Sequence, residues 1–396
     1  MARLTPRYNL KKYRILYFPL LLPIALLIAL FNKVSSKPFK IYNMMVNRVG
    51  HLAANQEIFC CHQDLGMLPN EFRVLVYRYH PANQFLMDMW KRVLPINQWF
   101  LPLFDVCNKL GGLGIVSQYI PRTINGADYK NITAKTSQHL SFTDEERIEA
   151  RRQMRGLDID PDKPFVPVLA RDSEYLTHLK EPTDTDSYRN VDVSTFVPAM
   201  EYLADNYQVI RAGSVVSGPI QSDHPQILDY SLSGKLTELL DVYFSARCDF
   251  FFSSSTGLDS ITKHCFRLPL LLANYIPPAD VVTIKPGSLF IPKKYWHVSE
   301  ERYLTLSEML SSDICKMFNP RELSPLSIEV HDNTPEEIVE VAEEMVARQA
   351  GTWVENEEDL ERQSQYKAIY EKYFPDHSYV GRIGTAFLRN NPEWIS

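Results

Sequence analysis

Short apolar strands alternate with helical segments along most of this chain, and this alternation constrains its fold more than any other feature. From Lys40 onward, segments typical of buried strands are each followed by a segment with helical spacing of apolar residues. Strands joined by helices pair in parallel, so the pattern predicts the α/β class. We expect strands at 41–46, 73–79, 165–170, 207–211, 248–252, 268–273 and 289–292, and helices at 51–61, 82–93, 143–156, 194–206, 235–246, 258–266, from 334 onward and at 360–373.

The alternation comes in two blocks. A chain of 396 residues is long enough for two domains. The segment 158–164, rich in Asp and Pro, reads as a linker between the blocks. We expect a basic, apolar leader over 1–37, an acceptor-side α/β domain over 38–160, a donor-binding α/β domain over 161–330 and a helical tail over 331–396. The two domains are predicted to be Rossmann-like and to face a cleft.

Charge is distributed unevenly. Residues 1–50 hold nine Lys or Arg and no Asp or Glu, although the whole chain has a net charge of −6. The rest of the chain is therefore acidic, which argues against nucleic acid as a partner. A basic leader on such a body suits an anionic membrane surface. The six cysteines have no C-x-x-C spacing, which is typical of a reduced, cytosolic protein rather than a zinc or disulfide scaffold.

The leader contains a stretch of 17 residues without a charge, 15–31. As a helix it reaches about 25 Å, slightly less than a hydrocarbon core of ~30 Å. Pro19 and Pro23 interrupt its first half, and no small-residue cleavage site follows it. A spanning anchor and a buried core helix remain open alternatives. The basic flanks favour a segment that lies in the interface, with the body on the cytoplasmic face of the inner membrane.

Polar residues cluster where the expected strands end, and ligands bind outside the carboxyl ends of strands in open parallel sheets. His51 follows the first strand, where an imidazole can act as a general base or simply cap a helix. Arg171 and Asp172 follow a strand of the second block. An arginine and a carboxylate at one strand end suit anion binding and acid/base chemistry. A purely structural ion pair between them is the alternative explanation.

Four further strand ends suit the phosphates of a donor. An arginine can pair with a phosphate, and a glycine beside it lets the phosphate come close to the backbone. Hydroxyl groups at the start of a helix can donate hydrogen bonds to a phosphate. An ordinary serine cap and exposed lysines near a turn are the plainer readings of these residues. The candidate donor-binding residues are Arg171, Arg211, Gly213, Ser254, Ser255, Thr256, Gly257, Asn274 and Lys293.

Signals for a metal or a cofactor are missing from the sequence. It contains no phosphate-binding P-loop motif and no G-x-G-x-x-G after a strand. The Asp-x-Asp patterns at 158–160 and 184–186 lie in polar, loop-like stretches, and the ten histidines have no metal-ligand spacing. We therefore expect metal-independent chemistry without a cofactor.

The order of these segments resembles a bacterial family of glycosyltransferases found in surface-polysaccharide gene clusters. The likeness covers about residues 41–372. Its segments are 48–52 (RVGHL), 171–173 (RDS), 188–190 (YRN), 209–213 (VIRAG), 251–257 (FFSSSTG), the loop at Asn274 and 334–338 (TPEEI), with Trp353 beyond.

The resemblance implies the two-domain GT-B fold, with a nucleotide-sugar donor held by the C-terminal domain. By this resemblance, donor phosphates would contact Arg211, Gly213 and 254–257, and His51 would be the catalytic base. Asp172 is the other candidate base, on the strength of its place at a strand end. We expect transfer of a sugar to a cell-surface glycan or a lipid-linked precursor. The alternatives are a pyruvyl or polyol-phosphate transferase on the same scaffold, and a non-catalytic, membrane-bound assembly protein.

Overall fold

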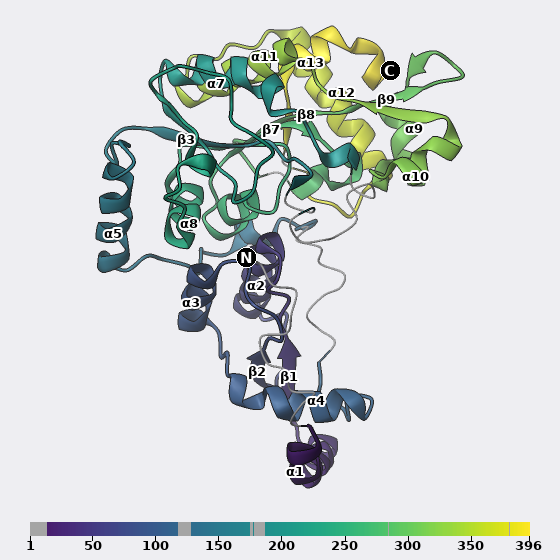
Figure 1. Cartoon of the computed structure of the whole chain (residues 1–396). Coiled ribbons are helices and arrows are strands. Elements are labelled where there is room, and N and C mark those ends of the chain that lie inside the picture. The colour runs from purple at the N-terminus through teal and green to yellow at the C-terminus, as the bar shows by residue number, and fades with distance from the viewer. Residues whose placement is uncertain (1–13, 118–127, 175–176, 178–186, 284, 380) are drawn as a thin grey trace. The chain divides into compact units, whose positions relative to one another are not determined.

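The computed structural model of the chain describes residues 14–117, 128–174, 177, 187–283, 285–379 and 381–396 (Figure 1). The first 13 residues of the basic leader and the Asp-x-Asp pattern at 184–186 lie outside the described residues. The chain divides into two compact units. Unit 1 comprises residues 1–126 and 132–142, and unit 2 comprises 127–131 and 143–396.

Unit 1 is built on a pair of parallel strands. Strands β1 (Phe39–Asn43) and β2 (Phe72–Val76) pair with Ile41 opposite Val74, and helix α2 (Val49–Asp64) connects them. Parallel strands need such a crossover connection. The other elements of this unit are α1 (Arg14–Val34), α3 (Gln84–Val93), η2 (Gln98–Phe100), α4 (Leu101–Lys109) and η3 (Ile132–Lys135).

Helix α1 packs along the rest of unit 1. Ala25 is fully buried in a cluster with residues of α4, and the Tyr17 hydroxyl donates a hydrogen bond of 2.8 Å to Asp105 Oδ2. The amide of Asn32 donates to the carbonyl of Phe39. The opposite face of the helix is apolar and exposed: Leu16, Leu20, Leu27, Leu30 and Val34. The stretch Leu16–Val34 is long and apolar enough to cross a membrane.

Unit 2 contains two sheets and the remaining helices. Its strands are β3 (Phe165–Leu169), β4 (Gln208–Arg211), β5 (Ile227–Leu228), β6 (Phe251–Ser253), β7 (Leu270–Tyr275), β8 (Leu289–Pro292), β9 (Lys294–His297), β10 (Arg302–Tyr303), β11 (Ile328–His331) and β12 (Arg382–Ile383). Its helices are α5 (Asp144–Arg155), α7 (Val197–Ala204), α8 (Glu238–Arg247), α9 (Leu306–Leu310), α10 (Pro320–Leu323), α11 (Pro335–Gln349), α12 (Glu357–Tyr373) and α13 (Thr385–Asn390).

The larger sheet has seven parallel strands in the order β12-β8-β7-β6-β3-β4-β5. Helices α7 and α11 lie on one face of it and α8 lies on the other (Figure 1). Strands covered on both faces are continuously apolar, as in 250–252, where three consecutive phenylalanines are fully buried. The α/β class predicted from the sequence is confirmed.

Several predicted boundaries are confirmed closely. Strand β8 has the predicted limits, and α11 begins at Pro335 after a capping box in which Thr334 and Glu337 bond reciprocally. A second capping box, formed by Thr143 and Glu146, starts α5. These signals are local, so the sequence alone reveals them.

Three features differ from the prediction. Residues 143–160, assigned to the first domain, belong to unit 2, because α5 packs on α8 and Gln153 accepts a hydrogen bond from Thr237. The expected helix at 258–266 is a short π-helix, Ile261–Cys265. The C-terminal tail, predicted to be helical, also contains a strand, because β12 pairs with β8 and extends the large sheet.

Candidate functional site

The polar strand ends predicted to bind a donor lie at one edge of the seven-stranded sheet. In strand order they follow β8, β7, β6, β3 and β4, which are consecutive neighbours. All these strands are parallel, so their carboxyl ends meet at the same edge. We call the residues at these ends the carboxyl edge: Arg171, Asp172, Arg211, Gly213, 253–257, Asn274 and Lys293.

The serine run after β6 is held by its own hydrogen bonds. Ser253 Oγ donates to Asp259 Oδ2 at 2.9 Å, and the Thr256 amide donates to the same oxygen at 2.8 Å. Ser254 Oγ accepts a bond of 2.9 Å from the backbone N–H of Arg171, which ties β6 to β3. Burial raises the pKa of Asp259. The hydroxyls of Ser253 and Ser254 therefore help to shape the loop.

The rest of this loop is more accessible. Ser255 and Thr256 are half-buried and Gly257 is exposed. Ser255 has a left-handed backbone with φ of 62°, and its carbonyl accepts a hydrogen bond of 3.2 Å from Arg189. Because the π-helix that follows is short, the helix start adds little positive field here. A phosphate at this loop would be held by hydroxyls and backbone N–H groups.

Asp172 organises the loop that follows β4. Its Oδ2 accepts hydrogen bonds from the backbone N–H and the hydroxyl of Ser217, at 2.9 and 3.2 Å. Its Oδ1 caps the N–H of Glu174. Arg171 beside it is half-buried at the end of β3. Asp172 thus has a structural role in the chain as it stands, and Arg171 is the cation of the carboxyl edge with the most exposure.

Arg211 and Gly213 lie in a tight setting at the end of β4. Arg211 is 3% exposed, and its Nη1 donates to Asp229 Oδ2 at 2.9 Å and to the carbonyl of Gly218 at 2.6 Å. Gly213 has a φ of 131°, and a Cβ there would lie 3.2 Å from Leu169 Cδ1. The glycine is required by backbone conformation and close packing. Arg211 has a carboxylate partner already.

Asn274 and Lys293 join the ends of β7 and β8. Asn274 has a φ of 57° at an irregularity of β7, and it exchanges hydrogen bonds of 2.7 and 2.6 Å with Asn333. Lys293 Nζ donates to Asp332 Oδ1 at 2.6 Å and to the carbonyl of Asn190. Burial lowers the pKa of Lys293. The side-chain nitrogen of Asn274, Nδ2, is buried and has no hydrogen-bond partner among the described residues.

A cavity of about 230 Å³ opens beside the loops after β3 and β4. It is lined by 192–194 and Val197 on one side and by 217–221 on the other. Ser217 is held by Asp172 and Gly218 by Arg211, so two carboxyl-edge residues fix one wall. Ligand pockets usually measure about 300–1,000 Å³, so this cavity suits part of a nucleotide sugar rather than the whole molecule.

His51 lies in unit 1, in the first turn of α2 and beyond the carboxyl end of β1. It is half-buried. Burial lowers the pKa of His51; a hydrogen bond with Asn55 opposes this shift, and the nearby charge of Arg48 adds to it. The imidazole is therefore neutral at neutral pH, which is the form that can accept a proton.

Sequence reasoning missed the partners of these residues. Asp229, Asp332 and Asn333 hold Arg211, Lys293 and Asn274. Each partner is at least 18 positions away along the chain, so no local motif announces it. Sequence reasoning also missed a cluster in unit 1, Glu57, Cys61 and His139, for which the i, i+4 spacing of Glu57 and Cys61 was an available signal.

The sequence matches no protein-family model and no curated protein. The structure is similar to a glycosyl transferase family 9 protein from Veillonella parvula, with 9% identity, a TM-score of 0.44 and coverage of 79% of this chain and 98% of that one. It is similar to the E. coli ADP-heptose lipopolysaccharide heptosyltransferase II, with 11% identity, a TM-score of 0.44 and coverage of 79% and 100%.

A third similar structure is a dodecameric iron-containing heptosyltransferase in complex with ADP-heptose. It shares 14% identity with this chain, at a TM-score of 0.30 and with coverage of 61% of this chain and 60% of that one. The likeness to all three structures is partial.

Proposed function

We propose that this protein is a glycosyltransferase that binds a nucleotide-sugar donor at the carboxyl edge of unit 2. The observation that carries the proposal is the meeting of five polar strand ends at one edge of a parallel sheet. That edge is where α/β sheets bind ligands. The enzyme class agrees with the family that the sequence resembles and with the class named for the three similar structures.

The contacts at the carboxyl edge refine the roles of the predicted residues. Arg211 and Lys293 already pair with carboxylates, so we assign them to holding loops. We assign the donor phosphates to Arg171, which is the most exposed cation of the carboxyl edge, and to Ser255, Thr256 and the backbone at Gly257. Transfer by these groups needs no metal ion at the carboxyl edge, since cation and N–H donors can stabilise a leaving diphosphate.

The acceptor is proposed to be a glycan or a lipid-linked precursor at the cytoplasmic face of the membrane. One face of α1 is apolar and exposed, while the other is bonded to unit 1 through Tyr17 and Asn32. A helix tied along its length to a folded unit suits the membrane interface better than a spanning anchor. An enzyme held at that surface meets lipid-linked substrates directly.

Thermal unfolding of the full chain in detergent tests the donor site. We expect one family among UDP, GDP, CDP, ADP and CMP to raise the midpoint by a few degrees, since ligand at about 100 times its dissociation constant adds ~2.7 kcal/mol. Arg171→Ala should lose that shift. The matched control is Arg247→Ala, an exposed arginine on α8, which should retain it. No shift with any nucleotide, or a full shift in Arg171→Ala, would contradict the proposed site.

A further inference from the structure

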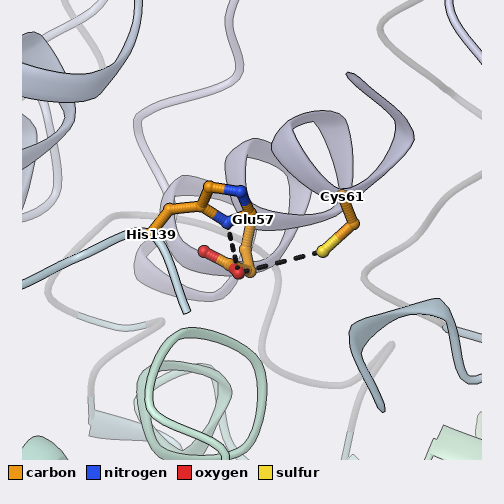
Figure 2. A group of neighbouring side chains, drawn as sticks. All are labelled: Glu57, Cys61 and His139. Atoms are coloured by element: carbon orange, nitrogen blue, oxygen red, sulfur yellow. Dashed lines mark hydrogen bonds and ion pairs between the residues drawn. The ribbon is translucent and has the colours of Figure 1, made fainter. Parts of the chain in front are cut away.

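Three side chains of different chemistry converge in unit 1 (Figure 2), whereas the residues assigned to the donor belong to unit 2. Glu57 and Cys61 lie one turn apart on α2, and both side chains are fully buried. His139 comes from the segment after η3 and points its ring at the same carboxylate (Figure 2). The three candidate ligand atoms all lie within 4.8 Å of one another.

We propose that Glu57, Cys61 and His139 bind a divalent transition metal ion of the zinc class. Their atoms are a carboxylate oxygen, a thiol sulfur and an imidazole nitrogen, the donor types that zinc takes in proteins. A mixed set of this kind disfavours Mg²⁺ and Ca²⁺, which require oxygen ligands.

The distances are close to those that a tetrahedral ion needs. His139 Nδ1 lies 2.8 Å from Glu57 Oε1, and Cys61 Sγ lies 3.8 Å from the same oxygen. Ordinary zinc bond lengths and tetrahedral angles give about 3.3 Å for the nitrogen–oxygen edge and about 3.6 Å for the sulfur–oxygen edge. The two observed separations differ from these values by about 0.5 Å and about 0.2 Å, and all three atoms lie within 4.8 Å of one another.

The surroundings of the three ligands match those of a metal site. Asp64 Oδ2 lies 2.9 Å from the other ring nitrogen of His139, so a carboxylate orients the imidazole and leaves Nδ1 for the metal. Metal-binding histidines are held in this way. Thr136 Oγ1 donates a bond of 3.0 Å to Cys61 Sγ. His139 keeps 15% of its side-chain exposure, which lets solvent supply a fourth ligand.

Such an ion would connect parts of unit 1 that are distant in sequence. His139 is 82 positions from Glu57. The ion would fix the segment that carries His139 to α2, the helix that also carries His51. Its role is structural and separate from the proposed sugar transfer, so donor binding and metal binding can fail independently. The same residues without a metal form a salt bridge, with a protonated His139 between Glu57 and Asp64.

Cobalt titration distinguishes these two states. Full chain without a polyhistidine tag is treated with a chelator, dialysed and titrated with Co²⁺. We expect one equivalent to bind, with a thiolate-to-cobalt charge-transfer band that an equivalent of Zn²⁺ removes. Cys61→Ser should lose the band. Cys60→Ser is the matched control, since Cys60 is equally buried and adjacent but outside the cluster, and it should retain the band.

The proposal has a second readout. His139→Asn should weaken Co²⁺ binding at least tenfold, in the range of losses seen when a metal site is impaired. It serves in place of Cys61→Ser if that variant does not fold by circular dichroism. Absence of a thiolate–cobalt band from the wild type, or an unchanged band in Cys61→Ser and His139→Asn, would overturn the metal site in favour of the salt bridge.

Discussion

Arg211 and Asp229 form an ion pair at the end of β4, with Nη1 and Oδ2 separated by 2.9 Å. Asp229 Oδ2 also accepts from the backbone N–H of Ile220, and Arg211 donates to the carbonyl of Gly218. The pair therefore fixes the loop that lines the cavity beside the carboxyl edge. The contact of Arg211 with a donor phosphate stays a prediction, and in the structure its guanidinium holds this loop.

Removing Arg211 should destabilise unit 2. Arg211→Met leaves the Asp229 carboxylate largely buried without its cation, and breaking a buried pair costs about 3–5 kcal/mol. We expect about 3 kcal/mol, because Asp229 keeps 19% of its side-chain exposure. Urea unfolding measures the loss. The double variant Arg211→Met with Asp229→Asn should recover part of it, and a single variant with wild-type stability would refute the pair's role.

If His51 is the catalytic base, the rate should depend on pH in a specific way. Burial holds the pKa of His51 below 6.5, so the imidazole stays unprotonated and active at pH values where an exposed histidine is half protonated. Activity should rise with pH as the base loses its proton, and the acid limb of kcat/KM should lie below pH 6.5. The measurement is a rate profile with the donor identified by thermal unfolding.

Substitution of His51 completes this test. His51→Ala should lower kcat by about 10²–10⁴, the usual contribution of a general base, and should leave donor binding intact. His80→Ala, another half-buried histidine of unit 1, is the control and should retain activity. Near-wild-type turnover in His51→Ala would remove this residue from the mechanism.

The exposed face of α1 predicts how the protein meets a membrane. Leu20 and Leu27 are 73% and 67% exposed. Burying a leucine contributes about 1.5 kcal/mol or more, so Leu20→Glu with Leu27→Glu should weaken binding to vesicles of phosphatidylcholine and phosphatidylglycerol roughly a hundredfold. Leu360→Glu on α12 should have no effect. Cosedimentation measures this, and equal binding by all variants would exclude α1 as the contact.

Much of the fold could be predicted from the sequence because the signals are local. The capping residues before α5 and α11 and the apolar run of β8 mark their elements directly. Strands β9 and β11 were missed because their antiparallel pairing joins Lys294–His297 to Ile328–His331, short segments of mixed polarity. The two-residue strand β12 carries no periodicity at all.

The candidate site could be predicted in place but not in detail. Strand ends point to the carboxyl edge because parallel strands share that edge. Which strands are neighbours depends on the strand order, which only the structure gives. Whether a cation is available depends on its partner, and Lys293 finds Asp332 39 positions later in the chain. The assignments of His51, Arg171 and the serine run to catalysis and donor binding stay predictions.

The pairing of β12 with β8 has a consequence for the order of assembly during synthesis. β8 is complete at Pro292, yet its outer neighbour ends at Ile383, about ninety residues later. At roughly 5–20 residues per second on the ribosome, the backbone N–H and carbonyl groups along that side of β8 wait on the order of 5–20 seconds for a partner. An uncovered strand of this kind is a template for pairing with another nascent chain. That side of β8 is covered only once Arg382 and Ile383 have been made and have paired with Leu289 and Phe290.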